Sequence, residues 1–242
     1  MRRFVLSFLI LALLLVASPA WATFPTEGTA TLTDTAVGTS HVVNLPTCAS
    51  GNLFVVVGIL DGSVTAVSWP GSWVELLGYD DAGAVDTAGY LFSTGGESTV
   101  TVTSTGSDDG AWIAWCITGA HASQAPELTF IDNGATSTPD PPQETASWGA
   151  EDNLWITCVG NTTGAQTITS YPANYTNSVD NQGAGNRVSC ATRQLNAASE
   201  DPGTFTLSGS TGSKTTWTIV VRPAAVVASR GCGGFLLFEG GC

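Results

Sequence analysis

The sequence predicts an all-β protein: an antiparallel β-sandwich, jelly-roll-like, built from two sequence-related halves. Three observations predict this class. Short segments alternate apolar residues with threonine, clusters of Gly, Asp, Ser and Asn separate them, and no sustained helical period occurs after residue 22. The chain has 28 glycines and only 11% charged residues, a composition typical of strands joined by tight turns.

Individual strands follow from the local pattern. The run 53–57 is apolar and mostly β-branched without interruption, which predicts a central strand buried on both faces. Val100 and Val102 alternate with threonines, as expected of a strand with one buried face. Trp217, Ile219 and Val221 would share one face of a further strand.

The two halves are predicted from four matches that keep their order along the chain. The matching segments are 52–58 (NLFVVVG) with 153–160 (NLWITCVG), 68–73 (SWPGSW) with 170–175 (SYPANY), 98–103 (STVTVT) with 203–208 (GTFTLS), and 113–117 (IAWCI) with 217–221 (WTIVV). Chance can produce one such match, whereas four in order indicate two copies of one unit. We therefore expect related halves at 23–122 and 123–223, either covering each other in one sandwich or forming two tandem sandwiches.

The segments outside the halves have their own composition. The stretch 133–143 contains Pro139, Pro141 and Pro142, and we expect it to cross from one half to the other, since proline interrupts strand pairing. Residues 224–242 form a Cys/Gly-rich C-terminal tail that includes four consecutive apolar residues. The tail is expected to pack against its own sandwich, or to add to a neighbouring subunit's sheet edge in a homo-oligomer.

Residues 1–22 have the pattern of a secretory signal peptide. Arg2 and Arg3 precede an apolar run at 4–17, and Ala20-Trp21-Ala22 supplies the small residues that signal peptidase cleaves after. The run is short for a membrane span, so we expect a secreted, extracellular or cell-surface protein with no membrane insertion after cleavage. An uncleaved N-terminal anchor is the alternative.

The charge excludes some partners. The chain has 20 acidic and 7 basic residues, a formal charge of -13, and loss of Arg2 and Arg3 with the signal peptide leaves 20 against 5, or -15. Such a chain has no cationic face for phosphates, so we expect no nucleic-acid partner and no binding to anionic membranes. The acidity suits a solvent-facing protein or weak attraction of divalent cations.

Six cysteines remain after the signal peptide: Cys48, Cys116, Cys158, Cys190, Cys232 and Cys242. An even number in an exported chain predicts disulfides, and no Cys/His cluster predicts zinc. We expect Cys158 with Cys190 and Cys232 with Cys242, which leaves Cys48 with Cys116. Buried free thiols in the strands are the alternative.

The sequence shows no catalytic signature. His41 and His121 are the two histidines, and neither belongs to a recognisable nucleophile motif. A pair of carboxylates, as in glycosidases, is unavoidable among 20 acidic residues and therefore indicates little. We expect a protein that is not an enzyme and has no cofactor.

The acidic turns are candidate binding sites for one structural calcium ion. The weak candidate ligands are Asp80, Asp81 and Asp86, and Asp108–Asp109 and Asp180 lie in similar turns. None has the ligand spacing of a known calcium loop, so ordinary solvated turns are the alternative.

Aromatic residues give the candidate ligand-binding positions. Trp69 and Trp73 flank a proline in the first half, and Tyr171 and Tyr175 flank one in the second. Exposed aromatic rings can stack on sugars, and two such sites would add avidity. The same residues could instead close the ends of the core, and Trp148 carries the same two interpretations.

Two segments resemble a known group of proteins. They are 46–119, which contains GNLFVVV, DGS, WPGSW, TVTVTSTG and AWIAW, and 159–223, which ends in TIVVRP. They resemble uncharacterised β-sandwich modules of tailed-phage virion proteins and exported bacterial proteins. The resemblance implies a virion-surface or cell-surface module without enzymatic activity, although the signal peptide and the cysteines depart from the phage pattern. We therefore expect recognition of a surface glycan or protein ligand, or a structural subunit of a fibre, surface layer or virion decoration.

Overall fold

The predicted all-β class is confirmed. The computed structural model describes residues 23–62, 64–80 and 83–225, and within these ranges the regular elements are β-strands paired antiparallel. The predicted signal peptide 1–22 and the tail from 226 onward lie outside the described residues. No helix in the described part of the chain is long and apolar enough to cross a membrane.

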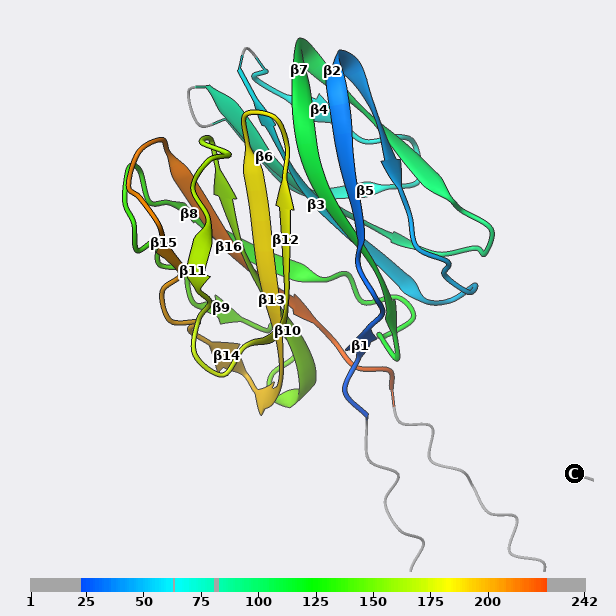
Figure 1. The fold of residues 1–242 in the computed structure, drawn as a ribbon. Coiled ribbons are helices and arrows are strands. Elements are labelled where there is room, and N and C mark those ends of the chain that lie inside the picture. The colour runs from blue at the N-terminus through cyan, green and yellow to red at the C-terminus, as the bar shows by residue number, and fades with distance from the viewer. Residues whose placement is uncertain (1–22, 63, 81–82, 226–242) are drawn as a thin grey trace, which may run out of the picture. The chain divides into compact units, whose positions relative to one another are not determined.

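Two sheets from the two halves of the chain form the main layers (Figure 1). The strands of the first sheet are β1 (Thr26–Glu27), β2 (Thr31–Asn44), β3 (Leu53–Asp61), β4 (Val67–Ser68), β5 (Val74–Asp80), β6 (Ala84–Phe92) and β7 (Thr99–Thr118). Those of the second are β8 (Glu127–Asp132), β10 (Glu151–Asn161), β12 (Thr176–Gln182), β13 (Arg187–Ala197) and β16 (Lys214–Val221). Two short ribbons pair β9 (Glu144–Thr145) with β14 (Ser199–Glu200), and β11 (Ile168–Ser170) with β15 (Thr206–Leu207).

The two sheets share one strand order. It is β5-β6-β3-β7 with β2 also on β7 in the first sheet, and β12-β13-β10-β16-β8 in the second. The registers also correspond: Val74 pairs with Tyr90, and Thr176 with Thr192, each position shifted by 102 residues. The internal duplication remains an inference, and this shared order is the observation that supports it.

The main core lies between the two sheets. Alternation along β3 directs Leu53, Val55 and Val57 inward, where they pack in one buried cluster with Ile156 of β10 and Trp217 of β16. The expected central strand at 53–57 is confirmed, because β3 lies between β6 and β7 and is buried on both faces.

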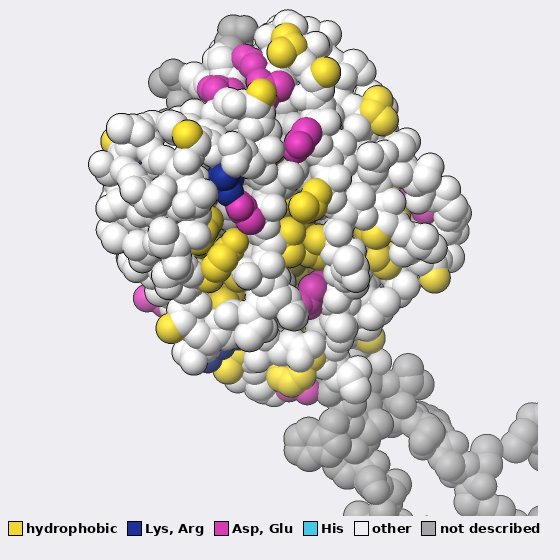
Figure 2. Space-filling view, in the orientation of Figure 1, with side chains coloured by type: hydrophobic (Ala, Val, Ile, Leu, Met, Phe, Trp, Pro, Cys, Tyr) yellow, Lys and Arg dark blue, Asp and Glu magenta, His cyan; other side chains and the backbone are white. Residues whose placement is uncertain are grey.

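A second apolar layer covers the outer face of each sheet. In the first half, Phe54 and Val56 pack under Val100 and Val102 of β7, which pairs there with β2. In the second half, the short ribbons and Phe205 cover the outer faces of β10 and β16. On the side shown in Figure 2, apolar side chains are visible between the two main layers, while acidic side chains gather toward the upper end.

The expected crossing at 133–143 is wrong. Strand β8, which precedes that segment, already pairs with β16 in the second sheet, so the chain crosses between the end of β7 and the start of β8. The prolines instead hold the segment along the outside of the second sheet. There the backbone N–H of Phe205 donates to the carbonyl of Pro139, and the hydroxyl of Thr218 donates to the carbonyl of Pro142.

Two of the expected disulfides are present. Cys48 is joined to Cys116, and Cys158 to Cys190, the latter between paired positions of β10 and β13. Disulfides of this kind are compatible with an extracellular protein. The predicted Cys232–Cys242 pair lies outside the described residues.

Candidate functional site

The tryptophan pair of the first half lies on the outer face of its sheet. Trp69 and Trp73 stack with ring centroids 5.4 Å apart, and both are half-buried against the outer apolar cluster. The indole N–H of Trp69 donates to the hydroxyl of Thr87 at 3.1 Å, and the ring rests on Gly89, where a Cβ would come within 2.8 Å. Tight packing of this kind makes the pair a structural element of the outer layer.

The tyrosine pair lies in the corresponding place on the second half. Tyr175 is only 8% exposed, and Tyr171 packs edge-on against Phe205 at 5.7 Å. Burial raises the pKa of Tyr171 to about 12, with the charge of Asp180 adding to the effect. Each aromatic pair lies in a turn of the same kind. In the first, the backbone N–H of Trp73 donates to the carbonyl of Pro70, and in the second, that of Tyr175 donates to the carbonyl of Pro172.

The structure does not bring the two aromatic pairs together. Each pair covers the outer face of its own sheet, so both sheets and the inner core separate them. Trp148 is half-buried on the same side as Tyr175; it donates to Asn153 and lies 5.9 Å from the Arg222 guanidinium. Sugar binding by these residues stays a prediction, while their contacts are those expected of residues that close the core.

The predicted calcium ligands do not converge either. Asp80 ends β5 and is exposed, whereas Asp86 is buried in β6 and points toward Gly160 of the facing sheet. Because Asp80 pairs with Val85, alternation places its side chain on the face opposite to that of Asp86. Asp81 lies outside the described residues. Across the described ranges, no group of three or more His, Cys, Asp or Glu side chains is arranged to hold a metal.

His41 is buried and takes part in a hydroxyl network. Its ring nitrogens lie 3.0 Å from the hydroxyls of Thr35 and Ser104, and burial lowers its pKa. Opposite Ser104, the imidazole contacts the hydroxyl of Thr35, whereas a catalytic triad would have a carboxylate at this position. The His41 side chain is also 0% exposed. His41 therefore serves to pair polar groups between the antiparallel strands β2 and β7.

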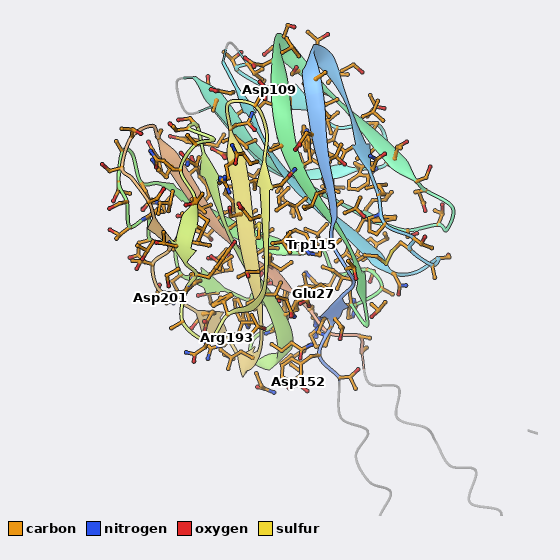
Figure 3. All side chains as sticks on the ribbon, viewed as in Figure 1. Glu27, Asp109, Trp115, Asp152, Arg193 and Asp201 are labelled. Carbon is orange, nitrogen blue, oxygen red and sulfur yellow. A yellow bond between two sulfur atoms is a disulfide. The ribbon has the colours of Figure 1, made fainter. Side chains whose placement is uncertain are left out.

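A polar groove opens where the edge of the first sheet meets β12 of the second. Its two adjoining hollows have volumes of about 330 and 430 Å³, and both are bordered by Glu27 and Asn177. The lining residues of the two hollows together are Thr26, Glu27, Gly28, Thr29, Ala30, Trp115, Asn174, Thr176, Asn177, Ser178, Val179, Thr192, Arg193 and Gln194. Figure 3 shows Glu27 and Trp115 on this side of the molecule, with Arg193 on the second layer.

The carboxylate of Glu27 is the centre of the groove. Its Oε1 accepts hydrogen bonds from the side-chain amide of Asn177 at 2.7 Å and from the hydroxyl of Thr192 at 2.6 Å. These donors come from β12 and β13, whereas Glu27 belongs to β1 of the other sheet. The contacts fix the carboxylate across the boundary between the two halves and leave Oε2 with no hydrogen-bond partner among the described residues.

Local backbone geometry exposes the polar groups of the groove. The pairing of β12 with β13 shifts register between Thr176 and Val179, and Asn177 in this bulge has a φ of 47°. Bulges re-aim side chains, and asparagine tolerates positive φ better than most residues. Beyond Thr192, β13 has no β12 partner, so Arg193 and Gln194 also border the groove.

The positive charge in the groove is already paired. The guanidinium of Arg193 lies 2.6 Å from the carboxylate of Glu200, which is largely buried. The amide of Gln194 donates to the carbonyl of Pro25 at 3.0 Å, and so helps to hold the start of the first half against the second. The groove thus presents amides, hydroxyls and one carboxylate, with no unpaired cation among its lining residues.

This groove is not predicted by any pattern in the sequence. Glu27, Asn177 and Thr192 lie far apart along the chain, and none belongs to a motif. The one local signal is the pair of asparagines, Asn174 and Asn177, which lie in and just after the matched segment 170–175.

Comparison with known proteins adds no relative: no family model, curated protein or solved structure matches the chain. The resemblance to phage and exported β-sandwich modules therefore stays a prediction.

Proposed function

We propose that the protein is a secreted, non-enzymatic recognition module that binds a neutral glycan of a surface in the groove around Glu27. The observation that carries this proposal is the network in which Asn177 and Thr192 hold the Glu27 carboxylate between the two sheets. A carboxylate fixed in this way is a preorganised acceptor for ligand hydroxyl groups.

The chemistry of the groove favours a ligand rich in hydroxyl groups. Sugars offer paired donors and acceptors, which match the carboxylate of Glu27 and the amides of Asn177 and Gln194. The net charge of -13 disfavours anionic glycans, and Arg193 is neutralised by Glu200. A lone carboxylate also lacks the second acid that glycosidases use, since Glu27 is the only acidic side chain among the described residues that line the groove.

The test is a glycan array with the mature protein, followed by calorimetry on the best ligand. We expect Glu27→Gln and Asn177→Gly each to weaken binding by about tenfold or more, as for loss of a hydrogen bond to a charged group. Asp201→Asn is the matched control, because it removes one exposed carboxylate outside the groove. Binding that survives both groove variants but is lost in Trp73→Ala would move the site to the outer aromatic pair.

A structural subunit is the second candidate function, and the open edge of the second sheet favours it. Strand β8 ends the sheet, and its Phe130 and Ile131 are 42% and 46% exposed. An apolar edge strand can pair with a neighbouring chain in a fibre, surface layer or virion decoration. Light scattering of residues 23–242 beside 23–225 and an Ile131→Lys variant tests this: concentration-dependent assembly lost in either variant would favour the structural role.

A further inference from the structure

A polar group from each sheet faces the inner gap at the end of the sandwich opposite to Glu27. On β3 and β7 the inward positions are those of Ile59 and Ala111, so alternation directs Asp61 and Asp109 inward as well. On β13, Val188 points inward, and so does Asn186 just before that strand. Figure 3 shows Asp109 at the upper end of the view, far from Glu27.

Contacts with the turn between β12 and β13 bring these groups together. The backbone N–H of Ala184 donates to Asp109 Oδ2 at 3.1 Å. A Cβ on Gly183 would lie 2.5 Å from Asn186 Oδ1 and 3.3 Å from Asp109 Oδ2. A Cβ on Gly185 would lie 2.8 Å from Asp61 Oδ2. Three side-chain oxygens therefore surround one glycine-rich turn.

The amide oxygen of Asn186 is the observation that points to a ligand. Asn186 is 0% exposed, and its Oδ1 has no hydrogen-bond partner among the residues that the structure describes. Its orientation is fixed, because the amide Nδ2 donates to the backbone carbonyl of Asp109 at 3.3 Å. A buried acceptor without a donor is costly, and a cation would complete it.

The local charge also lacks a counterion. The ion pairs of the described residues join Arg187 to Asp180, Arg193 to Glu200 and Arg222 to Glu151, and none involves Asp61, Asp108 or Asp109. The carboxylates of Asp61 and Asp109 therefore have no cationic side chain beside them among the described residues, and a bound cation would supply the missing counterion.

We propose that the turn 183–186 is a calcium site, with Asp61 Oδ2, Asp109 Oδ2 and Asn186 Oδ1 as protein ligands and water completing the coordination. Calcium accepts carboxylate and amide oxygens in irregular arrangements, whereas magnesium demands a tighter octahedron and zinc favours nitrogen and sulfur. The site has two carboxylates and one amide oxygen. It is therefore consistent with the absence, among the described residues, of any cluster of three His, Cys, Asp or Glu side chains. The site is separate from the glycan groove and would link the ends of the two sheets.

The test is calorimetric titration of the metal-free mature protein with calcium chloride, beside thermal unfolding with and without 10 mM calcium. We expect a Kd of about 0.1–1 mM, the range of extracellular calcium modules, and a rise in Tm of about 3–10 °C. Asp61→Asn and Asp109→Asn should each weaken binding about tenfold or more. Asp108→Asn is the matched control, since alternation directs Asp108 to the outer face, and it should change the Kd less than about threefold.

A gain-of-function variant guards against loss of fold in these mutants. Asn186→Asp places a third carboxylate among the ligands, so it should lower the Kd for calcium while reducing the Tm of the metal-free protein. The proposal is overturned if 10 mM calcium gives neither heat nor a Tm shift. It is equally overturned if Asp61→Asn, Asp109→Asn and Asn186→Asp all bind calcium as the unmodified protein does, because the binding would then be diffuse attraction to an acidic surface.

Discussion

Asn174 and Asn177 are the non-glycine residues with positive φ in the described part of the chain, and both border the groove. Backbone strain concentrates at functional sites, where the surrounding structure holds it in place. At Asn177 the strain directs the amide at Glu27, so one residue both shapes the bulge and supplies the donor.

Two substitutions separate these roles of Asn177. Asn177→Gly keeps the φ of 47° accessible, so the free energy of unfolding should change by less than about 1 kcal/mol while glycan binding weakens about tenfold or more. Asn177→Ala should lose binding and also destabilise the protein by about 1–2 kcal/mol, because alanine is strained at this φ. Urea unfolding of both variants checks this; equal stability of the two would show that the backbone relaxes without cost.

Glu97 makes stability depend on acid pH. Hydrogen bonds from the hydroxyl and backbone N–H of Thr94 lower its pKa to about 2, from an ordinary 4.5. A lowered pKa means that the contribution to stability is complete above pH 4.5 and is lost as the pH falls toward 2. We expect the free energy of unfolding of Glu97→Gln to fall less steeply across this window than that of the unmodified protein. Parallel curves from urea unfolding at several pH values would contradict this.

At the residue scale, the sequence predicted the two disulfides of the described residues, because an even number of cysteines indicates pairing. The cysteine pairs Cys48–Cys116 and Cys158–Cys190 are as predicted. Glu27 could not be assigned to a site, because its partners Asn177 and Thr192 are set by sheet-to-sheet packing and by a bulge, which no short pattern in the chain specifies.

At the scale of elements, the sequence predicted strands better than connections. The apolar run of β3 is a local property, and that strand forms where expected. The alternation at Val100 and Val102 also lies in a strand, but β7 continues as one strand to Thr118 through Asp108 and Asp109, which were expected in a turn. The crossing was misplaced, since prolines at 133–143 indicate only a segment outside a sheet and not which sheet it borders. Strand β8 belongs to the second sheet because it pairs with β16, which lies more than eighty residues further along the chain. No local pattern in the sequence specifies this pairing.

The disulfide Cys48–Cys116 ties the segment before β3 to the end of β7 across 68 residues. A closed loop of this length restricts the unfolded chain, so replacing both cysteines with alanine should cost about 3–4 kcal/mol. The buried position of both side chains adds packing to this loss. Chemical denaturation of the double variant beside the oxidised protein measures the difference, and a change below about 1 kcal/mol would show that the bond adds little.

At the scale of the whole molecule, the shared strand order suggests that two copies of one unit meet through their inner faces. Each half contributes large apolar side chains to the central core, among them Trp115 from the first and Trp217 from the second. A half on its own would expose this surface to water. We expect 23–122 and 123–225 to aggregate or bind a hydrophobic dye when expressed singly, and to form a stable complex when co-expressed. Two well-folded monomeric halves would instead identify tandem, independent sandwiches.

The most direct test of the recognition proposal is to map the bound glycan by NMR, using backbone and indole resonances of the isotopically labelled mature protein. If the glycan binds in the groove, saturable shift changes should concentrate at Glu27, Asn177 and the segment 192–194, with the Trp69 and Trp73 indoles unchanged. Shift changes centred on Trp69, Trp73 or Tyr171 would contradict it and would place recognition on the outer faces of the sandwich.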